Sequence, residues 1–327
     1  MGNKNEKQKN KKKEIKNIIF NYSKNYLTTH IHTLEVFNLL ILQDGRLSSS
    51  SDDGKLIIYN KNNASVDLII AEHGNDTLSY HIQLKNGNLG TCSYDHTIKI
   101  IKLQGKTQYK LLQTITDHTD KVLKILEYKE NNIISCSYDK TMKVFILEND
   151  IYKCTKSIEI NNTPEDDSNL LFIKKYSEIL TSSYNDKYIK FWNIEEKKDI
   201  QLMAQINDIS CSVWPNSMTI MGDKLFIGTE NDGLFIISIK KHCIISNIEK
   251  DISNICTVIS LINGNIMIGG RNTEGQSIIE YKFEDGILLK INSKYTEHSE
   301  NITDIITLNN GNVITCSMDE RIKFFSK

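Results

Sequence analysis

The stretch Cys92-Ser93-Tyr94-Asp95-His96-Thr97-Ile98-Lys99-Ile100 decides the fold. It joins a small residue and a Ser to a turn that begins at an Asp, and then to a strand in which apolar and polar residues alternate. Close copies start at Cys136 and Cys316. Counted from the Ser position, the copies begin at 51, 93, 137, 183, 229, 270 and 317, so they are 41 to 47 residues apart. Self-similarity at such a period indicates a repeat protein.

Two β-like runs joined by a tight turn precede most copies. The turns are Asp44-Gly45, Asn86-Gly87, Asn131-Asn132, Asn263-Gly264 and Asn310-Gly311. Such residue pairs tolerate the positive φ angles of a two-residue hairpin. A further run, for example Tyr109–Ile115, lies upstream, so each unit supplies four antiparallel strands and no amphipathic helix. Because the period matches a four-stranded blade, we predict an all-β, seven-bladed β-propeller.

One such sheet cannot bury both of its faces, but seven sheets around an axis shield one another. The chain ends just after the third strand of the last unit, and Asn17–Tyr22 forms a lone β-like run before the first. We predict that this N-terminal run completes the seventh blade; the alternative is a frayed arm. The expected domains are a disordered basic tail, 1–16, and a single propeller, 17–327.

Charge and composition narrow the function classes. The formal net charge is −1, although residues 1–16 carry seven lysines. The rest of the chain has no clustered excess of Lys and Arg, so no nucleic-acid partner is expected. There is no signal-peptide core and no apolar run of about 18 residues. Seven cysteines without an export signal predict reduced thiols. We expect a monomeric propeller in the cytoplasm, with the nucleus as the alternative.

The repeated unit resembles that of the WD-repeat family over essentially the whole chain after residue 16. Blades of that family often pair a His with the turn Asp and the Ser. Here a His stands 21 or 22 residues before four of the Asp residues. The resemblance therefore implies four structural sets, which are His32, Ser51 and Asp53; His73, Ser93 and Asp95; His118, Ser137 and Asp139; and His298, Ser317 and Asp319.

The chain also departs from the family pattern. The Trp-Asp dipeptide is absent, and units four to six lack the His, with Asp251 at the equivalent place in unit six. The loop geometry of those three blades is therefore open. The ungapped match of 254–272 with 301–319, including both Asn-Gly turns, still assigns unit six.

In the WD-repeat family, the residue before the turn Asp points from the partner-binding face. The resemblance places tyrosines there in three consecutive units, Tyr94, Tyr138 and Tyr184. Tyrosine is favoured at binding hot spots. The other residues that the resemblance places on this face are Asp52, Glu230, Arg271 and Met318 before the turn, and Glu35, Lys121, Trp214, Asn254 and Asn301 at or near the inner strands. The alternative is ordinary loop exposure.

Signs of catalysis are missing. The phosphate-binding loop, the zinc motif and the nucleophile elbow do not occur. His30-x-His32 could contact a metal, but no further ligands complete a site. We therefore expect no catalytic residues, no metal and no cofactor. The predicted function is a non-catalytic scaffold or adaptor that binds proteins or peptides, as a subunit of a larger complex. The alternative is a phosphoinositide-binding or membrane-binding propeller, with membrane contact through the basic tail. The paired Arg of related lipid-binding propellers is missing at Arg271-Asn272.

Overall fold

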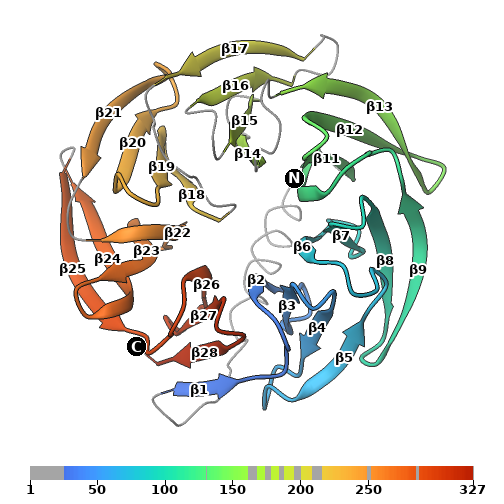
Figure 1. Cartoon of the computed structure of the whole chain (residues 1–327), viewed down its shortest axis with the longest axis horizontal. Coiled ribbons are helices and arrows are strands. Elements are labelled where there is room, and N and C mark those ends of the chain that lie inside the picture. The colour runs from blue at the N-terminus through green and yellow to red at the C-terminus, as the bar shows by residue number, and fades with distance from the viewer. Residues whose placement is uncertain are drawn as a thin grey trace, which may run out of the picture.

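The computed structural model describes residues 26–129, 131–160, 168–173, 178–183, 188–194, 200–207, 216–248, 252–284 and 287–326. The strands within these ranges form seven antiparallel sheets of four strands each. Figure 1 shows the sheets following one another around a central axis. The predicted seven-bladed β-propeller is confirmed. The described ranges contain no helix long and apolar enough to cross a membrane.

Blades 1 to 4 follow the chain from the first inner strand onward. Blade 1 consists of β2 (Val36–Ile41), β3 (Leu47–Ser51), β4 (Leu56–Tyr59) and β5 (Val66–Ile70). Blade 2 consists of β6 (Leu78–Gln83), β7 (Leu89–Ser93), β8 (Ile98–Gln104) and β9 (Gln108–Ile115). Blade 3 consists of β10 (Val122–Lys129), β11 (Asn132–Ser137), β12 (Thr141–Glu148) and β13 (Ile151–Glu159). Blade 4 consists of β14 (Ser168–Ile173), β15 (Glu178–Ser183), β16 (Ile189–Asn193) and β17 (Gln201–Ile206).

The remaining blades complete the ring. Blade 5 consists of β18 (Met218–Met221), β19 (Lys224–Gly228), β20 (Leu234–Ser238) and β21 (Cys243–Ile248). Blade 6 consists of β22 (Ser253–Ser260), β23 (Asn265–Asn272), β24 (Gly275–Glu284) and β25 (Ile287–Tyr295). Blade 7 consists of β26 (Ile302–Thr307), β27 (Val313–Ser317), β28 (Ile322–Phe325) and the N-terminal strand β1 (Tyr26–Thr29).

The ring is closed by the N-terminal strand, as predicted, but by a different segment. β1 pairs antiparallel with β28, so that Tyr26 lies opposite Phe325 and Thr29 lies opposite Ile322. The prediction that Asn17–Tyr22 makes this pairing was wrong. Residues 17–22 lie outside the described residues. The short strand Tyr26–Thr29 has weak alternation, so its pairing depends on the free edge of β28 more than on its own pattern.

The repeated turns give the disc two distinct faces. The Asn-Gly and Asn-Asn turns join the first and second strands of their blades and have the expected positive φ, for example 87° at Gly87 and 62° at Asn131. The turns that begin at the repeated Asp join the second and third strands, at the opposite end. We call the face with the Asp turns the upper face and the face with the Asn-Gly turns the lower face.

Apolar layers between neighbouring blades form the core. Between blades 1 and 2, Leu56 and Ile58 of β4 pack in one cluster with Leu78 and Leu89 of the next blade. All four side chains are at most 1 % exposed. Full burial of one such side chain stabilises the fold by about 1.5–3 kcal/mol. Because each blade packs on the next, the stability of the ring depends on its completeness.

A buried carboxyl connects the last blade to the first. The Oδ2 atom of Asp304 accepts hydrogen bonds from the Leu39 backbone N–H, at 2.8 Å, and from Asn38 Nδ2, at 3.1 Å. Its Oδ1 atom accepts one from the backbone N–H of Ile305, at 2.8 Å. Burial raises the pKa of Asp304 to about 7, although these donors favour the carboxylate. The contact joins β26 to β2, so it supports closure at the inner strands while β1 closes the outer edge.

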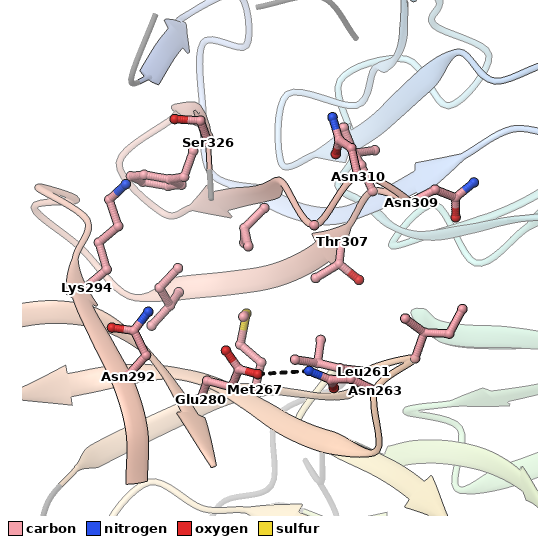
Figure 2. Close-up of a pocket in the computed structure, with 16 residues that line it drawn as sticks. Leu261, Asn263, Met267, Glu280, Asn292, Lys294, Thr307, Asn309, Asn310 and Ser326 are labelled. Carbon is pink, nitrogen blue, oxygen red and sulfur yellow. Dashed lines mark hydrogen bonds between the residues drawn. The ribbon is translucent and has the colours of Figure 1, made fainter. Parts of the chain in front are cut away.

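A pocket of about 320 Å³ lies between blades 6 and 7 toward the lower face (Figure 2). Both Asn-Gly turns of these blades line it, and so do the ends of β27 and β28 on that side. Its deeper lining is apolar and includes Met267, Ile278, Val313 and Phe325. The side chains of the two blades therefore leave an open space at the lower end of this joint.

Candidate functional site

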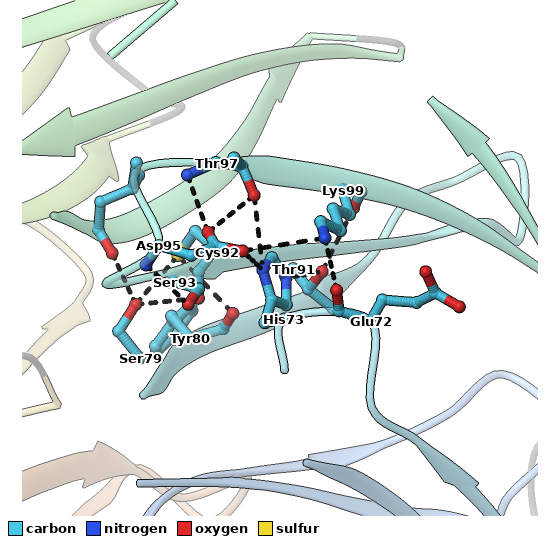
Figure 3. Close-up of polar contacts among 11 residues, drawn as sticks. Glu72, His73, Ser79, Tyr80, Thr91, Cys92, Ser93, Asp95, Thr97 and Lys99 are labelled. Carbon is cyan, nitrogen blue, oxygen red and sulfur yellow. Dashed lines mark hydrogen bonds and ion pairs between the residues drawn. The ribbon is translucent and has the colours of Figure 1, made fainter. Parts of the chain in front are cut away.

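A buried polar network ties the upper loops of blade 2 together (Figure 3). His73 Nδ1 lies 2.7 Å from Asp95 Oδ2, and His73 Nε2 lies 2.8 Å from Thr91 Oγ1. Ser93 Oγ accepts a hydrogen bond of 3.1 Å from the Asp95 backbone N–H. Asp95 Oδ1 in turn accepts one of 2.9 Å from the backbone N–H of Thr97. One carboxylate therefore holds the incoming loop, the turn and the third strand.

The same network recurs in blades 1, 3 and 7. The distances from His Nδ1 to the Asp carboxylate are 3.1 Å for His32 and Asp53, 2.7 Å for His118 and Asp139, and 2.8 Å for His298 and Asp319. The distances from His Nε2 to a hydroxyl are 2.7 Å to Ser49, 2.6 Å to Ser135 and 2.8 Å to Thr315. The hydroxyls of Ser51, Ser137 and Ser317 each accept a 3.1 Å hydrogen bond from the backbone N–H of the turn Asp.

The sequence suggested that the repeated Ser bonds to the His. In the structure the hydroxyl of this Ser instead accepts a hydrogen bond from the backbone of the turn Asp. The Ser bonds to the backbone of the turn Asp, whereas the His bonds to the hydroxyl two residues earlier in the strand. Residues two apart in a strand point to the same face. The His ring reaches the middle of the second strand, and the Ser at its end is left to hold the turn.

The networks hold the Asp residues as carboxylates. Burial alone raises the pKa of Asp53, but the hydrogen bond and charge of His32 and the backbone N–H groups of Thr33 and Lys55 lower the pKa to about 2. At Asp95, burial again raises the pKa, but His73 and the hydroxyl and backbone N–H of Thr97 lower it to about 2. Since buried polar groups need partners, these sets stabilise the blades. Both ring nitrogens of each His are already bonded, which leaves none for a metal or a reaction.

The chain shows no metal site where it is described. Among the described residues, no group of three or more His, Cys, Asp or Glu side chains is placed to hold an ion. His30, the partner of His32 in the His30-x-His32 pair, instead lies with Nε2 2.8 Å from Glu320 Oε2 at the surface. The two histidines therefore have separate structural partners.

Blades 4 to 6, which lack the His, have other polar contacts at the corresponding strands and turns. In blade 4, Trp192 Nε1 donates a 2.9 Å hydrogen bond to Thr181 Oγ1, the hydroxyl equivalent to the one that His contacts elsewhere. In blade 5, Thr229 Oγ1 accepts a hydrogen bond from the Asp232 backbone N–H, at 3.1 Å. In blade 6, Asn272 Oδ1 accepts one from the Glu274 backbone N–H, at 2.9 Å. Asp251, the predicted counterpart of the His, lies outside the described residues.

The small residue before each Ser is packed, not reactive. Gly228 and Gly269 occupy this position in blades 5 and 6, and a Cβ added at Gly228 would lie 2.1 Å from Ile255 Cγ2. Cys92 and Cys316 are fully buried at the same position, and burial raises the pKa of both thiols, that of Cys92 to about 12. The six cysteines in the described part of the chain are free thiols.

Backbone hydrogen bonds pair the residues that the resemblance places on the upper face. The residue before the turn Asp donates its backbone N–H to a backbone carbonyl oxygen. That oxygen belongs to the residue just before the inner strand of the same blade. These bonds are Asp52 to Glu35 at 2.9 Å, Tyr94 to Thr77 at 3.0 Å, Tyr138 to Lys121 at 2.9 Å and Met318 to Asn301 at 3.1 Å. In blades 1, 3 and 7 the two sets of predicted residues therefore lie side by side. Between blades 5 and 6, the Asn254 N–H bonds instead to Glu230 O, at 2.6 Å.

Two of the predicted tyrosines form one aromatic patch with a lysine, defined here by Tyr94, Lys121 and Tyr138. The two ring centroids lie 6.3 Å apart. Lys121 Nζ lies 4.6 Å from the Tyr94 centroid and 5.3 Å from the Tyr138 centroid. An ammonium over an aromatic ring is stabilised by about 0.5–1 kcal/mol at exposed sites. The patch bridges blades 2 and 3. Both rings are half-buried against a core cluster, so the patch offers their remaining ring area together with a positive charge.

An acidic patch, defined by Glu35, Asp52 and Glu300, lies beside it on blades 1 and 7. Burial, and then repulsion from Asp52 and Glu300, raises the pKa of the Glu35 carboxyl. Thr77 Oγ1 donates a short hydrogen bond to Asp52 Oδ1, which connects this patch to blade 2. Sequence reasoning missed Thr77, although it stands 18 residues before Asp95, the same interval that separates Glu35 from Asp53. Counting back from the turn Asp, not forward from the His, would have found it.

The remaining predicted face residues are spread around the ring. Arg271 is exposed on blade 6, and Met318, Asn254 and Asn301 are half-buried. The Asn301 side-chain oxygen accepts a 3.0 Å hydrogen bond from Gln276 Nε2. Tyr184, the third predicted tyrosine, and Trp214 lie outside the described residues.

Polar residues on the inner strands were also missed by sequence reasoning. Lys124 on β10 is only 8 % exposed, and its Nζ lies 4.8 Å from the Tyr80 ring centroid. Burial lowers the pKa of Lys124 to about 8. His81 on β6 is buried, with Nε2 2.8 Å from Ser48 Oγ, and burial lowers its pKa to about 3. The sequence of one inner strand does not reveal which of its polar side chains will be buried in the propeller.

Comparisons with known proteins agree with this architecture. Residues 109–145 and 289–326 match the family model described as "WD domain, G-beta repeat". Each match begins within the outer strand of one blade and extends through the first three strands of the next, so the sequence repeat is offset from the blade by one strand. No curated protein sequence matches the chain.

Among solved structures, the chain is similar to the WD40 β-propeller domain of Doa1. The TM-score is 0.71 at 19 % sequence identity, over 92 % of this chain and 95 % of that domain. At this identity the likeness extends to the fold alone.

Proposed function

We propose that this chain, a seven-bladed propeller with WD40 repeats, is a non-catalytic adaptor whose upper face binds partner proteins. WD40 propellers typically serve as protein-interaction scaffolds. A fold hosts many functions, so the argument has to come from the site. The observation that carries the proposal is the aromatic patch, in which Lys121 lies over the rings of both Tyr94 and Tyr138.

The patch has the chemistry of a binding hot spot. Tyrosine rings bury a large area at little entropic cost, and their hydroxyls remain able to bond at the edge of an interface. Here the lysine restrains both rings before a partner arrives, which lowers the ordering cost of binding. A partner with an apolar or aromatic anchor, flanked by an acidic group for Lys121, fits this patch.

The adjacent acidic patch extends the proposed surface. Burial, and then repulsion from Asp52 and Glu300, raises the pKa of Glu35. A basic side chain of the partner would relieve this repulsion. We therefore propose a partner segment that presents an apolar anchor to blades 2 and 3 and a Lys or Arg to blades 1 and 7. Complementary charge of this kind mainly sets specificity and the association rate.

Affinity capture from the source cell tests the proposal. The full chain is compared with a double variant, Tyr94→Ala with Tyr138→Ala, and with Tyr188→Ala as a matched control. Tyr188 is 39 % exposed and directly precedes β16, outside the patch. We expect proteins captured by the native chain to be lost with the double variant and kept with the control. Unchanged capture by the folded double variant would defeat the proposed face.

A second experiment separates the membrane alternative. The basic run of residues 1–16 is the feature that could hold an acidic lipid surface, and it lies outside the described residues. Flotation with phosphoinositide vesicles, with and without residues 1–16, measures this contribution. An adaptor that acts through its upper face keeps its protein partners when the tail is removed.

A further inference from the structure

The pocket between blades 6 and 7 is an apolar site for which none of the described residues supplies an occupant. Its volume, about 320 Å³, is within the range of ligand pockets, about 300–1,000 Å³. Figure 2 shows Met267 pointing into it from β23, between the turns of the two blades. Ile262, at the mouth, is fully exposed. Exposed apolar area beside an apolar hollow indicates a surface that is covered in use.

Two charged groups that line the pocket already have partners in blades 6 and 7. Glu280 Oε1 accepts hydrogen bonds from Asn263 Nδ2, at 3.2 Å, and from Asn265 Nδ2, at 2.6 Å. Lys294 Nζ lies 4.8 Å from the centroid of the Phe325 ring. These groups therefore do not demand a charged ligand. The occupant that best fits the pocket is a short apolar segment.

The N-terminal chain enters the propeller at this place. β1 runs antiparallel to β28, and its first residue, Tyr26, lies opposite Phe325. Phe325 and Ser326 both line the pocket. Tyr26, the first described residue, therefore lies at the lower face, beside the pocket. Six residues of extended chain span at most about 20 Å, so residue 20 is within reach.

The sequence before β1 contains such a segment. Ile18, Ile19 and Phe20 are consecutive apolar residues in a stretch that is otherwise rich in Lys and Asn. Since β1 supplies the fourth strand of blade 7, this run is not needed to close the ring. We propose that Ile18, Ile19 and Phe20 occupy the pocket between blades 6 and 7.

This contact places the basic tail on the side of the disc opposite to the aromatic patch. The lysines from Lys4 to Lys16 then extend from the lower face, whereas Tyr94, Lys121 and Tyr138 belong to the upper face. The tail and the proposed partner-binding face thus work independently. The proposal does not rest on the proposed adaptor function, because it concerns a different surface.

Photocrosslinking in the full chain tests the contact. Phe20 is replaced by p-benzoyl-phenylalanine, a ring of similar character whose excited ketone inserts into nearby C–H bonds. The same replacement at Asn10, in the same tail, is the control. After irradiation of the dilute protein, mass spectrometry maps the linked residues. We expect intramolecular links from position 20 to Met267, Val313, Phe325 or their neighbours, and few such links from position 10.

Two other results would overturn the proposal. Links from position 20 that join two chains would assign the pocket to a second copy, and links elsewhere in the chain, or none, would leave it without this occupant. Melting supplies a second readout. Phe20→Asp lowers the melting temperature by several degrees if the ring is buried, whereas Asn10→Asp, which adds the same charge to the tail, leaves it unchanged.

Discussion

Two histidines in one loop allow a sharp test of the buried networks. His32 is 2 % exposed and bonds to Asp53 at 3.1 Å and to Ser49 at 2.7 Å. His30 lies two residues earlier, with its side chain 55 % exposed, and bonds to Glu320 at 2.8 Å. Each is changed to Ala. The two variants remove the same side chain from almost the same place in the sequence.

The expected magnitudes differ because the environments differ. A buried hydrogen bond to a charged group contributes about 1.5–3 kcal/mol, and one to a neutral hydroxyl about 0.5–1.5 kcal/mol. His32→Ala therefore lowers the free energy of unfolding by about 2–4 kcal/mol. A surface ion pair contributes about 0–1 kcal/mol, so His30→Ala has an effect within that range.

Equilibrium unfolding in urea, followed by far-UV circular dichroism, measures both variants at neutral pH. The midpoint for His32→Ala falls clearly below that of the native chain, and the midpoint for His30→Ala stays close to it. Equal midpoints for the two variants would refute the view that the His and Asp networks stabilise the blades. A change in the slope of unfolding would indicate that the blades no longer unfold together.

Three further predictions concern charge, packing and thiols. The folded-state pKa of Asp95 is about 2, below its ordinary value of 3.8. Asp95 therefore contributes stability above about pH 4 that is lost as the pH falls toward 2. Urea titrations at a series of pH values are expected to show that Asp95→Asn flattens this part of the curve of stability against pH. Gly228→Ala places a Cβ 2.1 Å from Ile255 Cγ2 and destabilises the fold by about 1–3 kcal/mol, seen as a lower melting temperature; an unchanged value would contradict the packing argument. Cys243 is exposed and reacts with a thiol reagent in the folded chain, whereas Cys316 reacts only after unfolding, as mass spectrometry of the labelled peptides can show.

The fold could be predicted from the chain because its information is local and repeated. The turn residues, the alternation of the third strand and the small residue before the Ser recur in each unit, so that seven units could be counted even where the His was missing. The same repetition placed Tyr94 and Tyr138 at equivalent positions in neighbouring blades. Their mutual distance and the place of Lys121 between them were not predictable, since those depend on the angle between the blades.

The closing strand shows the limit of pattern reasoning. Asn17–Tyr22 has the stronger apolar pattern, yet Tyr26–Thr29 pairs with β28. An edge strand is selected by the free backbone groups of its neighbour and by the reach of the chain, neither of which is visible in a run of side chains.

The sequence alone determined the number of blades and the positions of their hairpins, and its resemblance to the WD-repeat family implied the pairing of each His with its turn Asp. Only the tertiary structure decided which hydroxyl each His contacts, which segment closes the ring and how Asp304 joins β26 to β2 across 265 residues. The physical reason is the distance along the chain over which each interaction acts. Turn chemistry and alternation act between residues a few positions apart, whereas the packing of one blade on another brings together groups whose separation in the chain carries no pattern.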